Sequence, residues 1–347
     1  MIYFNHDYLE GAHPLVLQKL VDNNMTQNIG YSCDPFCDAA RDKIRVACQA
    51  PEADVHFCVG GTQTNTTVIA SALRPYQGVL TAVSGHINNH ESGAIESTGH
   101  KVIALPSDDG KITAQQIEEY YLWQKNDESV EHIVQPGMVY LSYPTESGTL
   151  YTKAELTEIF ATCQKCGLPL FIDGARLGYG LTADSCDITL PEFARLCDIF
   201  YIGGTKIGAL FGEAVVIMNP ALKKDFRCMI KQRGGLLAKG HLLGLQFDAL
   251  FTDDLYFKIA RHANEMAYQV RAIFQSNGFP MLFESDTNQQ YPILSDDQLA
   301  ELGKNFGYDY WERTDPTHSG VRFCSSWATT QEQVDALREA VTALHNN

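Results

Sequence analysis

In the first 245 residues, hydrophobic side chains gather in short runs rich in β-branched and aromatic residues. Several runs are separated by segments whose apolar residues recur at helical spacing, such as residues 113–125 and 152–166. This alternation is typical of a mostly parallel sheet covered by helices. The predicted strands are residues 55–59, 79–83, 101–105, 138–142, 168–172, 198–202 and 214–218.

The pattern changes after residue 245, where longer amphipathic helices such as residues 257–278 alternate with short strands. This change predicts a large α/β domain over residues 1–245 and a smaller α+β domain over residues 246–347. The first residues of the chain are expected either in the large domain or packed against the small one.

Charge and composition exclude several classes of partner. The formal net charge is −16, and the 26 Lys and Arg residues are scattered, so neither nucleic acid nor an anionic membrane is expected as a partner. The N-terminus lacks the features of a signal peptide, and no apolar stretch approaches the roughly 20 residues that span a bilayer. Because the ten cysteines show no framework spacing, we expect reduced thiols and a cytoplasmic protein.

Cys163 and Cys166 form a Cys-x-x-Cys pair that closes a predicted helix at Gly167. Redox and metal sites built on such a pair need a second pair or a helix N-terminus beside it. The sequence offers neither, so we interpret both thiols as helix residues and predict no metal site.

Residues able to carry chemistry follow four of the predicted strands. In an open parallel sheet, ligands bind beyond the carboxyl ends of the strands, so these segments are expected to meet at one edge. Each is ordinary alone, because glycine turns, helix caps and loop histidines are common there. The segments are Gly60-Gly61-Thr62, Ser84-Gly85-His86, Asp173-Gly174-Ala175-Arg176 and Gly203-Gly204-Thr205-Lys206.

In combination these residues suit one cofactor. Gly61 and Thr62 at a helix N-terminus present N–H groups to a phosphate. Asp173 can fix a proton on a ring nitrogen, and a desolvated Lys206 is suited to an imine with an aldehyde. An imidazole such as His86 can stack on a ring, while arginines can grip a carboxylate with two bonds. Phosphate, ring nitrogen and aldehyde together describe pyridoxal 5′-phosphate.

Further motifs occur in a fixed order: DYLEGAHPLVLQKL, GGTQTN, GHINNHESGAIE, FIDGARLGYG, the segment around Lys206, and VRFCSSWAT. In this order they resemble the threonine aldolase group of the β-eliminating lyases. The resemblance implies an α/β fold of the pyridoxal-phosphate-dependent transferase type (fold type I, as in aspartate aminotransferase). We therefore expect a large, mostly parallel seven-stranded sheet domain and a smaller C-terminal α+β domain.

The resemblance also implies roles for the matching residues. Lys206 would carry the cofactor as a covalent imine, Asp173 would pair with the pyridinium nitrogen, and His86 would stack on the ring. The implied phosphate contacts are Gly61 and Thr62, with Arg233 or Lys239 in place of the family's arginine from a neighbouring subunit. The implied substrate contacts are Arg176, Arg322, His6 and Tyr31.

The chain departs from the family pattern near the substrate. His6 stands where the family usually has serine, and Glu146 stands where many members have an imidazole. The base that removes the substrate's hydroxyl proton is therefore open between Glu146, His86 and a water molecule between them.

The resemblance implies a lyase that cleaves a β-hydroxy-α-amino acid of the threonine or allo-threonine type into glycine and an aldehyde. β-Elimination or amino transfer on another amino acid is an alternative, since the same cofactor serves these reactions. A catalytically inactive cofactor-binding protein is an alternative of another class, which the intact Lys206, Asp173 and His86 disfavour. Shared active sites imply a homodimer or homotetramer.

Overall fold

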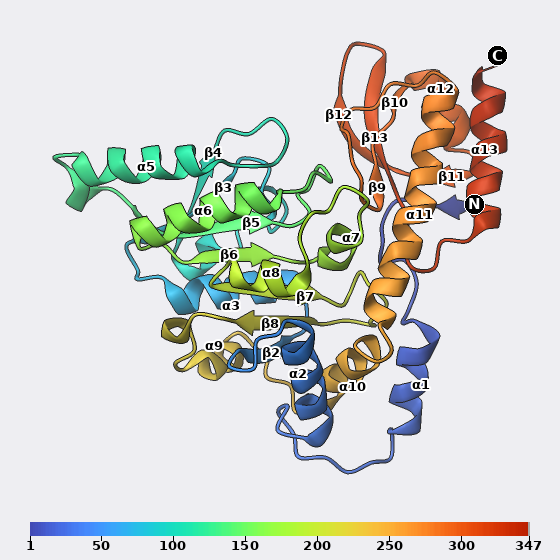
Figure 1. Cartoon of the computed structure of the whole chain (residues 1–347). Helices are drawn as coiled ribbons and strands as arrows, with labels where there is room; N and C mark the ends of the chain where they lie inside the picture. Colours follow the sequence, from blue (N-terminus) through green and yellow to red (C-terminus); the bar gives the residue numbers. More distant parts are fainter. Residues whose placement is uncertain (346–347) are drawn as a thin grey trace.

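The structure, a computed structural model, describes residues 1–345 and is built around a seven-stranded sheet (Figure 1). Its strands are β2 Asp54–Cys58, β3 Gln77–Ala82, β4 Lys101–Leu105, β5 Gln135–Ser142, β6 Leu170–Asp173, β7 Ile199–Gly203 and β8 Glu213–Ile217. The order is β2-β8-β7-β6-β5-β3-β4, and β8 alone runs antiparallel to its neighbours. Each predicted strand overlaps one of these, so the mostly parallel seven-stranded sheet is confirmed.

Helices cover both faces of this sheet. In β5, Val139 and Leu141 belong to the hydrophobic core of one face, while Met138 and Tyr140 belong to the core of the other. The helices of this part are α1 Pro14–Asp22, α2 Pro35–Ala47, α3 Gly61–Ala72, α4 His86–Asn89, α5 Ala114–Asn126, α6 Lys153–Cys166, α7 Leu177–Leu181, α8 Leu190–Arg195, α9 Phe226–Gln232 and α10 His241–Leu250, with 3-10 turns at Glu96–Thr98, Val130–His132 and Pro220–Leu222. Residues of α2, α5, α6, α8 and α10 enter the first core, and residues of α3, α4 and α9 enter the second.

Local sequence signals set the ends of the predicted helices. Thr113 and Thr152 close the N-termini of α5 and α6 with capping boxes, in which side chain and backbone satisfy each other's hydrogen bonds. Helix α6 ends at Gly167, whose φ of 68° lies in the left-handed region that glycine adopts without strain. Cys163 and Cys166 lie on α6 as free, buried thiols, as their interpretation as helix residues predicted.

A smaller C-terminal domain stands beside the large sheet (Figure 1). The long helix α11 Leu255–Ser276 leads into it, followed by β9 Gln289–Gln290, β10 Ile293–Ser295, α12 Asp296–Leu302, β11 Phe306–Gly307, β12 Asp309–Arg313, β13 His318–Cys324 and α13 Gln331–His345. Strands β9, β10 and β12 each pair antiparallel with β13. This domain has its own hydrophobic core, to which Phe4 contributes.

The N-terminal residues pack against this smaller domain, because β1 (Ile2–Tyr3) pairs in parallel with β11. Helix α10 crosses the predicted boundary after residue 245, with Leu243 and Phe247 in the core of the large sheet. The boundary itself stays a prediction, and residues 346 and 347 of the predicted second domain lie outside the described residues.

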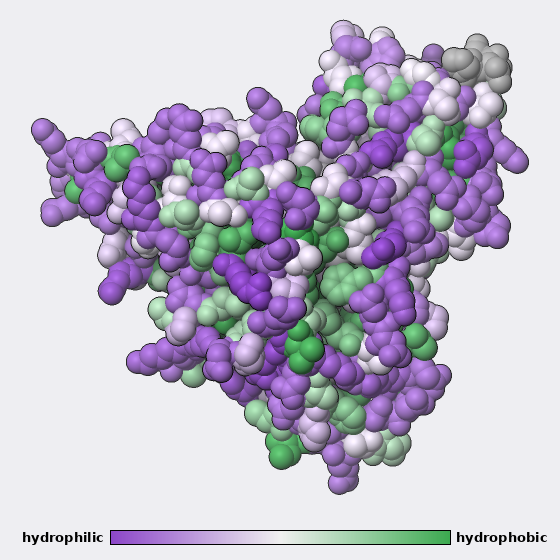
Figure 2. Space-filling view, in the orientation of Figure 1, coloured by the Kyte–Doolittle hydropathy of each residue, from purple (hydrophilic) through white to green (hydrophobic). Residues whose placement is uncertain are grey.

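Hydrophilic side chains cover most of the face shown in Figure 2, with smaller hydrophobic areas between them. Among residues 1–345, no helix is both long and apolar enough to cross a membrane.

Candidate active site

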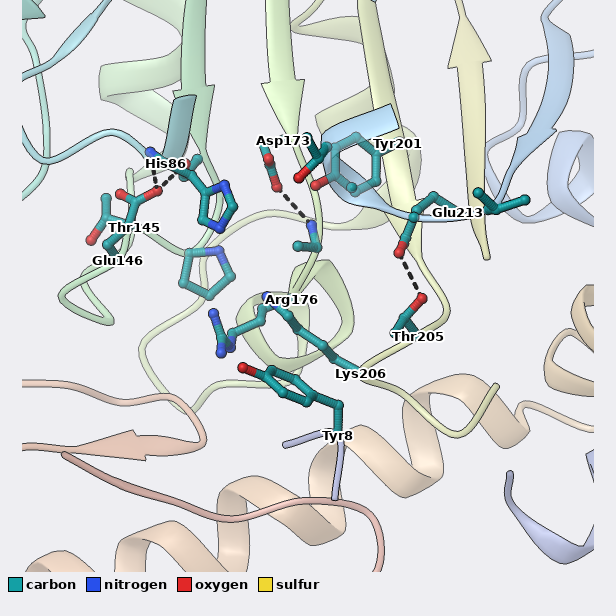
Figure 3. Close-up of a pocket in the computed structure, with 17 residues that line it drawn as sticks. Tyr8, His86, Thr145, Glu146, Asp173, Arg176, Tyr201, Thr205, Lys206 and Glu213 are labelled. Carbon is teal, nitrogen blue, oxygen red and sulfur yellow. Dashed lines mark hydrogen bonds between the residues drawn. The ribbon is translucent and has the colours of Figure 1, made fainter. Parts of the chain in front are cut away.

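The strand-end segments meet in a cavity at the carboxyl edge of the large sheet (Figure 3). The cavity holds about 340 Å³ and adjoins a second hollow of about 560 Å³ that reaches the smaller domain. Tyr8, His86, Glu146, Arg176 and Lys206 line both. The first cavity is also lined by Gly61, Thr62, Asp173, Tyr201, Thr205 and Glu213, and the second by His6, His90, Asp309, Trp311 and Arg322.

Two glycines let the ends of β6 and β7 approach each other closely. The N–H of Gly203 donates to the carbonyl of Gly174 at 2.9 Å. A Cβ at Gly174 would lie 1.9 Å from the carbonyl oxygen of Tyr201, which no side chain tolerates. This close approach holds Asp173 and Lys206 at neighbouring strand ends.

Asp173 ends β6 with a buried carboxylate that faces the cavity. One oxygen accepts hydrogen bonds from the Tyr140 hydroxyl at 2.5 Å and the Asn65 amide at 3.1 Å, and the other accepts from the N–H of Ala175 at 2.9 Å. Burial alone would raise the pKa of Asp173, but the nearby His86 and the hydrogen bonds hold it below its ordinary value. The group is therefore an anion at neutral pH.

Lys206 follows β7, and its Nζ forms no hydrogen bond or ion pair with any of residues 1–345. Burial and the Arg176 guanidinium lower the pKa of Lys206, against the opposing pull of the carboxylates of Asp7, Asp173 and Glu213. A lysine in this state has a larger share of neutral, nucleophilic amine than a solvated one.

His86 begins the short helix α4 and extends its ring toward the cavity (Figure 3). Its Nδ1 lies 2.8 Å from Oε1 of Glu91, whose side chain is completely buried. The amide of Asn65 donates to the same Glu91 oxygen at 2.7 Å and also to Asp173. One network of hydrogen bonds therefore joins the imidazole to the carboxylate at the end of β6.

Glu146 follows β5 and is held by two hydrogen bonds to one oxygen. Its Oε1 accepts from the Ser142 hydroxyl at 2.6 Å and from the backbone N–H of His86 at 2.9 Å, while its buried Oε2 has no partner within residues 1–345. Burial raises the pKa of Glu146, against these hydrogen bonds and the nearby His86. A carboxylate with a raised pKa and a free oxygen is suited to accept a proton.

Arg176 is bound by Asp7, from the far end of the chain. Its Nε and Nη2 donate to the two Asp7 oxygens at 2.7 and 3.0 Å, and the Asn288 amide donates to Asp7 at 2.9 Å. Burial opposes ionisation of Asp7, yet Arg176 and Lys206 hold its pKa well below the usual range. The guanidinium predicted to bind a substrate carboxylate thus has one of its nitrogens, Nη1, outside this pair.

Arg322 lies on β13 at the wall formed by the smaller domain. It forms an ion pair with Asp309, donates to Gln289 at 3.0 Å and lies 5.8 Å from the centre of the Trp311 ring. His6, at the position where the family usually has serine, lies 3.1 Å from the same Asp309 carboxylate. The Nε of Arg322 is buried without a partner among the described residues.

The predicted phosphate contacts lie at the N-terminus of α3. Gly61 and Thr62 line the cavity there, and no side chain of the described residues caps the helix. Across from them Glu213 accepts hydrogen bonds from the Thr205 hydroxyl at 2.8 Å and the N–H of Gly204 at 3.1 Å. An uncapped helix N-terminus favours an anion.

Three predicted residues lie outside this cavity within the single chain: Tyr31, Arg233 and Lys239. Arg233 ends α9, and its carbonyl accepts from Gln63 of α3 at 3.1 Å. Tyr31 is exposed, with the ammonium of Lys231 4.8 Å from its ring centre, and Lys239 is also exposed.

Sequence reasoning missed Asn65, Tyr140, Glu91, Glu213 and Asp7 as parts of this site. Glu91 stands inside the quoted GHINNHESGAIE motif, where an acid five residues after the histidine was an available signal. Asn65 closes the quoted GGTQTN motif, but nothing in that motif distinguishes it from the threonines beside it, and Tyr140 stands inside a strand of apolar character.

The chain is similar to known proteins of one family along nearly its whole length. The model of the Beta-eliminating lyase family matches residues 22–297. A solved threonine aldolase of Leishmania major is 44% identical with a TM-score of 0.97, covering 99% of this chain and 100% of that one. The low specificity L-threonine aldolase of Pseudomonas sp. (strain NCIMB 10558) is 28% identical, covering 98% of this chain and 97% of the relative. Its Pseudomonas aeruginosa counterpart is 29% identical, covering 96% and 95%.

These matches extend over nearly the whole chain and confirm the predicted pyridoxal-phosphate-dependent transferase-like fold. The family inferred from the motifs is also confirmed. The chain belongs to the β-eliminating lyase family.

Proposed function

We propose that this lyase is a pyridoxal-phosphate-dependent aldolase that cleaves a threonine-type β-hydroxy-α-amino acid into glycine and an aldehyde. Relatives that align over nearly the full chain carry the name threonine aldolase. The observation that carries the proposal is the presence, in one cavity, of an ionised Asp173 and a Lys206 amine that has no partner among the described residues.

The donor set of the cavity fits pyridoxal phosphate. Lys206 would bind the cofactor's aldehyde carbon through Nζ, Asp173 would hold the proton on the ring nitrogen, and the uncapped start of α3 at Gly61 and Thr62 would receive the phosphate. When bound, this cofactor supplies an electron sink for the electron pair left on Cα as the Cα–Cβ bond breaks.

Arg322 and Arg176 would bind the substrate carboxylate. Both line the larger hollow, and Asp7 fixes Arg176 in one orientation. The Nε of Arg322 is buried and has no partner within residues 1–345. Paired guanidinium donors recognise a carboxylate by geometry as well as charge. His6 shares Asp309 with Arg322, so its role would be to orient that arginine.

Glu146 would be the base that removes the hydroxyl proton from the substrate's Cβ. Its free Oε2 and the raised pKa of its carboxyl group meet the two demands on such a base. Ser142 and the backbone of His86 would hold the carboxylate in place during proton transfer.

We further propose a homodimer, or a tetramer of dimers, in which Arg233, Lys239 and Tyr31 serve the neighbouring active site. Within one chain these residues stand away from the cavity. Large apolar side chains are also exposed along α1 and the loop after it, including Val21, Met25 and Ile29. An active monomer in sedimentation at micromolar concentration would contradict this assembly. The cytoplasmic location stays a prediction from the sequence.

Product analysis tests the proposed reaction most directly. The purified chain, supplied with pyridoxal phosphate and either threonine or allo-threonine, should release glycine and acetaldehyde in equal amounts. Formation of an oxoacid with ammonia or with an aminated acceptor would instead indicate elimination or amino transfer. The Lys206→Ala variant is the matched control and should release neither product.

A further inference from the structure

We propose that Glu91 is a positioning residue that holds the His86 imidazole in the tautomer protonated on Nδ1, with the lone pair of Nε2 directed to the cavity. The inference rests on the proposed function, because it assigns a chemical state to a ring that would contact cofactor and substrate.

The hydrogen bond between the two side chains has a defined direction, with His86 as the donor. Nδ1 of His86 lies 2.8 Å from Oε1 of Glu91, and the Glu91 side chain has no exposed surface. The Asn65 amide donates to this same oxygen, which therefore acts as an acceptor, so we infer that the hydrogen of the contact with His86 sits on Nδ1. A neutral imidazole carries one N–H, so Nε2 is then an acceptor.

Asn65 fixes the orientation of Glu91. Its amide donates one hydrogen to Oε1 of Glu91 at 2.7 Å and the other to Asp173 at 3.1 Å. The carboxylate that sets the tautomer of His86 is therefore tied to the carboxylate expected at the cofactor's ring nitrogen.

A purely structural role for Glu91 would have the carboxylate bind the backbone of its own loop. The hydrogen bonds of this side chain go instead to His86 and Asn65, and its second oxygen, Oε2, is buried without a partner among the described residues. These contacts indicate that the Glu91 side chain orients the His86 imidazole and does not stabilise the backbone of its own loop.

The consequence concerns the β-hydroxyl group of the substrate. With the lone pair on Nε2, His86 offers the single hydrogen of this hydroxyl group an acceptor beside Glu146, whereas the other tautomer would offer the hydroxyl oxygen a donor. The tautomer set by Glu91 therefore favours a hydroxyl group that donates to one of these two acceptors, which is the polarity needed for its deprotonation by Glu146.

The test measures the tautomer itself in the full-length protein labelled with ¹⁵N-histidine. Spectra are taken with and without pyridoxal phosphate under mildly alkaline conditions, in which a free imidazole is neutral. The ring signals that are missing from the spectrum of the His86→Asn variant are assigned to His86. The wild-type chain and Glu91→Gln, whose carbonyl still accepts from Nδ1–H, should both show the Nδ1–H pattern.

The variant Glu91→Leu removes the acceptor and should convert His86 to the Nε2–H pattern, while Glu96→Gln, an exposed acid nearby, should change nothing. Turnover should fall at least about tenfold in Glu91→Leu with little change in KM, and Glu91→Gln should recover most of it. An Nε2–H pattern in the wild-type chain would overturn the proposal, even if Glu91→Leu fails to fold. Absence of aldolase activity with the Nδ1–H pattern intact would reject the proposed reaction while supporting the tautomer.

Discussion

Asp7 and Arg176 form a bidentate pair, with two parallel N–H···O bonds of 2.7 and 3.0 Å between the start of the chain and the end of β6. The pair links the N-terminal segment to the large sheet. This segment also contacts the smaller domain, because β1 pairs with β11. The side chain of Asp7 is completely buried and that of Arg176 is 13% exposed, so each neutralises a charge that solvent screens only weakly.

Loss of this pair should destabilise the chain. In Asp7→Asn the Arg176 guanidinium stays buried without its counter-charge, which costs about 3 to 5 kcal/mol of unfolding free energy. The control is Asp309→Asn, which breaks the more exposed pair with Arg322 and should cost less. If denaturant titrations gave equal losses of unfolding free energy for both variants, the greater burial of the Asp7–Arg176 pair would not account for its contribution to stability.

The position of the covalent bond to the cofactor is a second prediction. Borohydride reduction of the protein loaded with pyridoxal phosphate, followed by peptide mapping, should place the pyridoxyl group on Lys206, because this amine is the unpartnered one in the cavity. The Lys206→Ala variant should remain unlabelled. A label on any other lysine would show that the assignment is wrong.

Asp173→Asn should bind pyridoxal phosphate yet lose most turnover, because the carboxylate's charge keeps the ring nitrogen protonated. Removal of a buried ion pair costs about 3 to 5 kcal/mol, which is on the order of a thousandfold in rate if it falls on the transition state. Asp198→Asn, a buried acid that accepts the N–H of Leu170 away from the cavity, is the control and should leave turnover near the wild-type level. Near-wild-type turnover in Asp173→Asn would contradict the electronic role.

The pH profile of turnover should have an acid limb that reports the titration of Glu146. Burial raises the pKa of this group above its ordinary value of 4.5, and the base acts in its ionised form. Turnover should therefore decline as the pH falls through that raised pKa. In Glu146→Gln the rate should drop by about 10² to 10⁴ and the limb should disappear. An unchanged limb in this variant would assign the base to another group.

Glu213 should make the cofactor-free protein less stable as the pH rises. Burial raises its pKa from 4.5 to about 8, against the opposing charge of Lys206. Between these values the folded chain keeps a proton that the unfolded chain has lost, so this group's contribution to unfolding free energy decreases with rising pH. Melting temperatures of Glu213→Gln should depend less on pH in this window than those of the wild type, and Glu96→Gln should match the wild type.

The strand pattern predicted the sheet because strands buried on both faces are continuous apolar runs, and these are visible without any tertiary contact. For the same reason Asp173, His86 and Lys206 could be chosen from the sequence, since they stand directly after such runs. The rule that ligands bind at the carboxyl edge then brought them together.

The partners of these residues could not be found in this way. Asn65 is one of three buried polar residues of α3, and its contact with Glu91 depends on how that helix packs against the loop after α4. Asp7 meets Arg176 across 169 positions of sequence, a separation that no local pattern encodes. The placement of Tyr31, Arg233 and Lys239 depends on a second chain and stays a prediction.

Lys206 lies in the turn between β7 and β8, which follow each other in sequence and pair antiparallel, with Gly203 opposite Glu213. The other consecutive strands that pair in this sheet are parallel and are joined by long crossovers. Closing a short turn loses less chain entropy than closing a crossover, so we expect this hairpin to form early during folding. Pulsed hydrogen exchange should find β7 and β8 amides protected before those between β5 and β6. The lysine's loop would then be shaped before the rest of the cavity assembles around it.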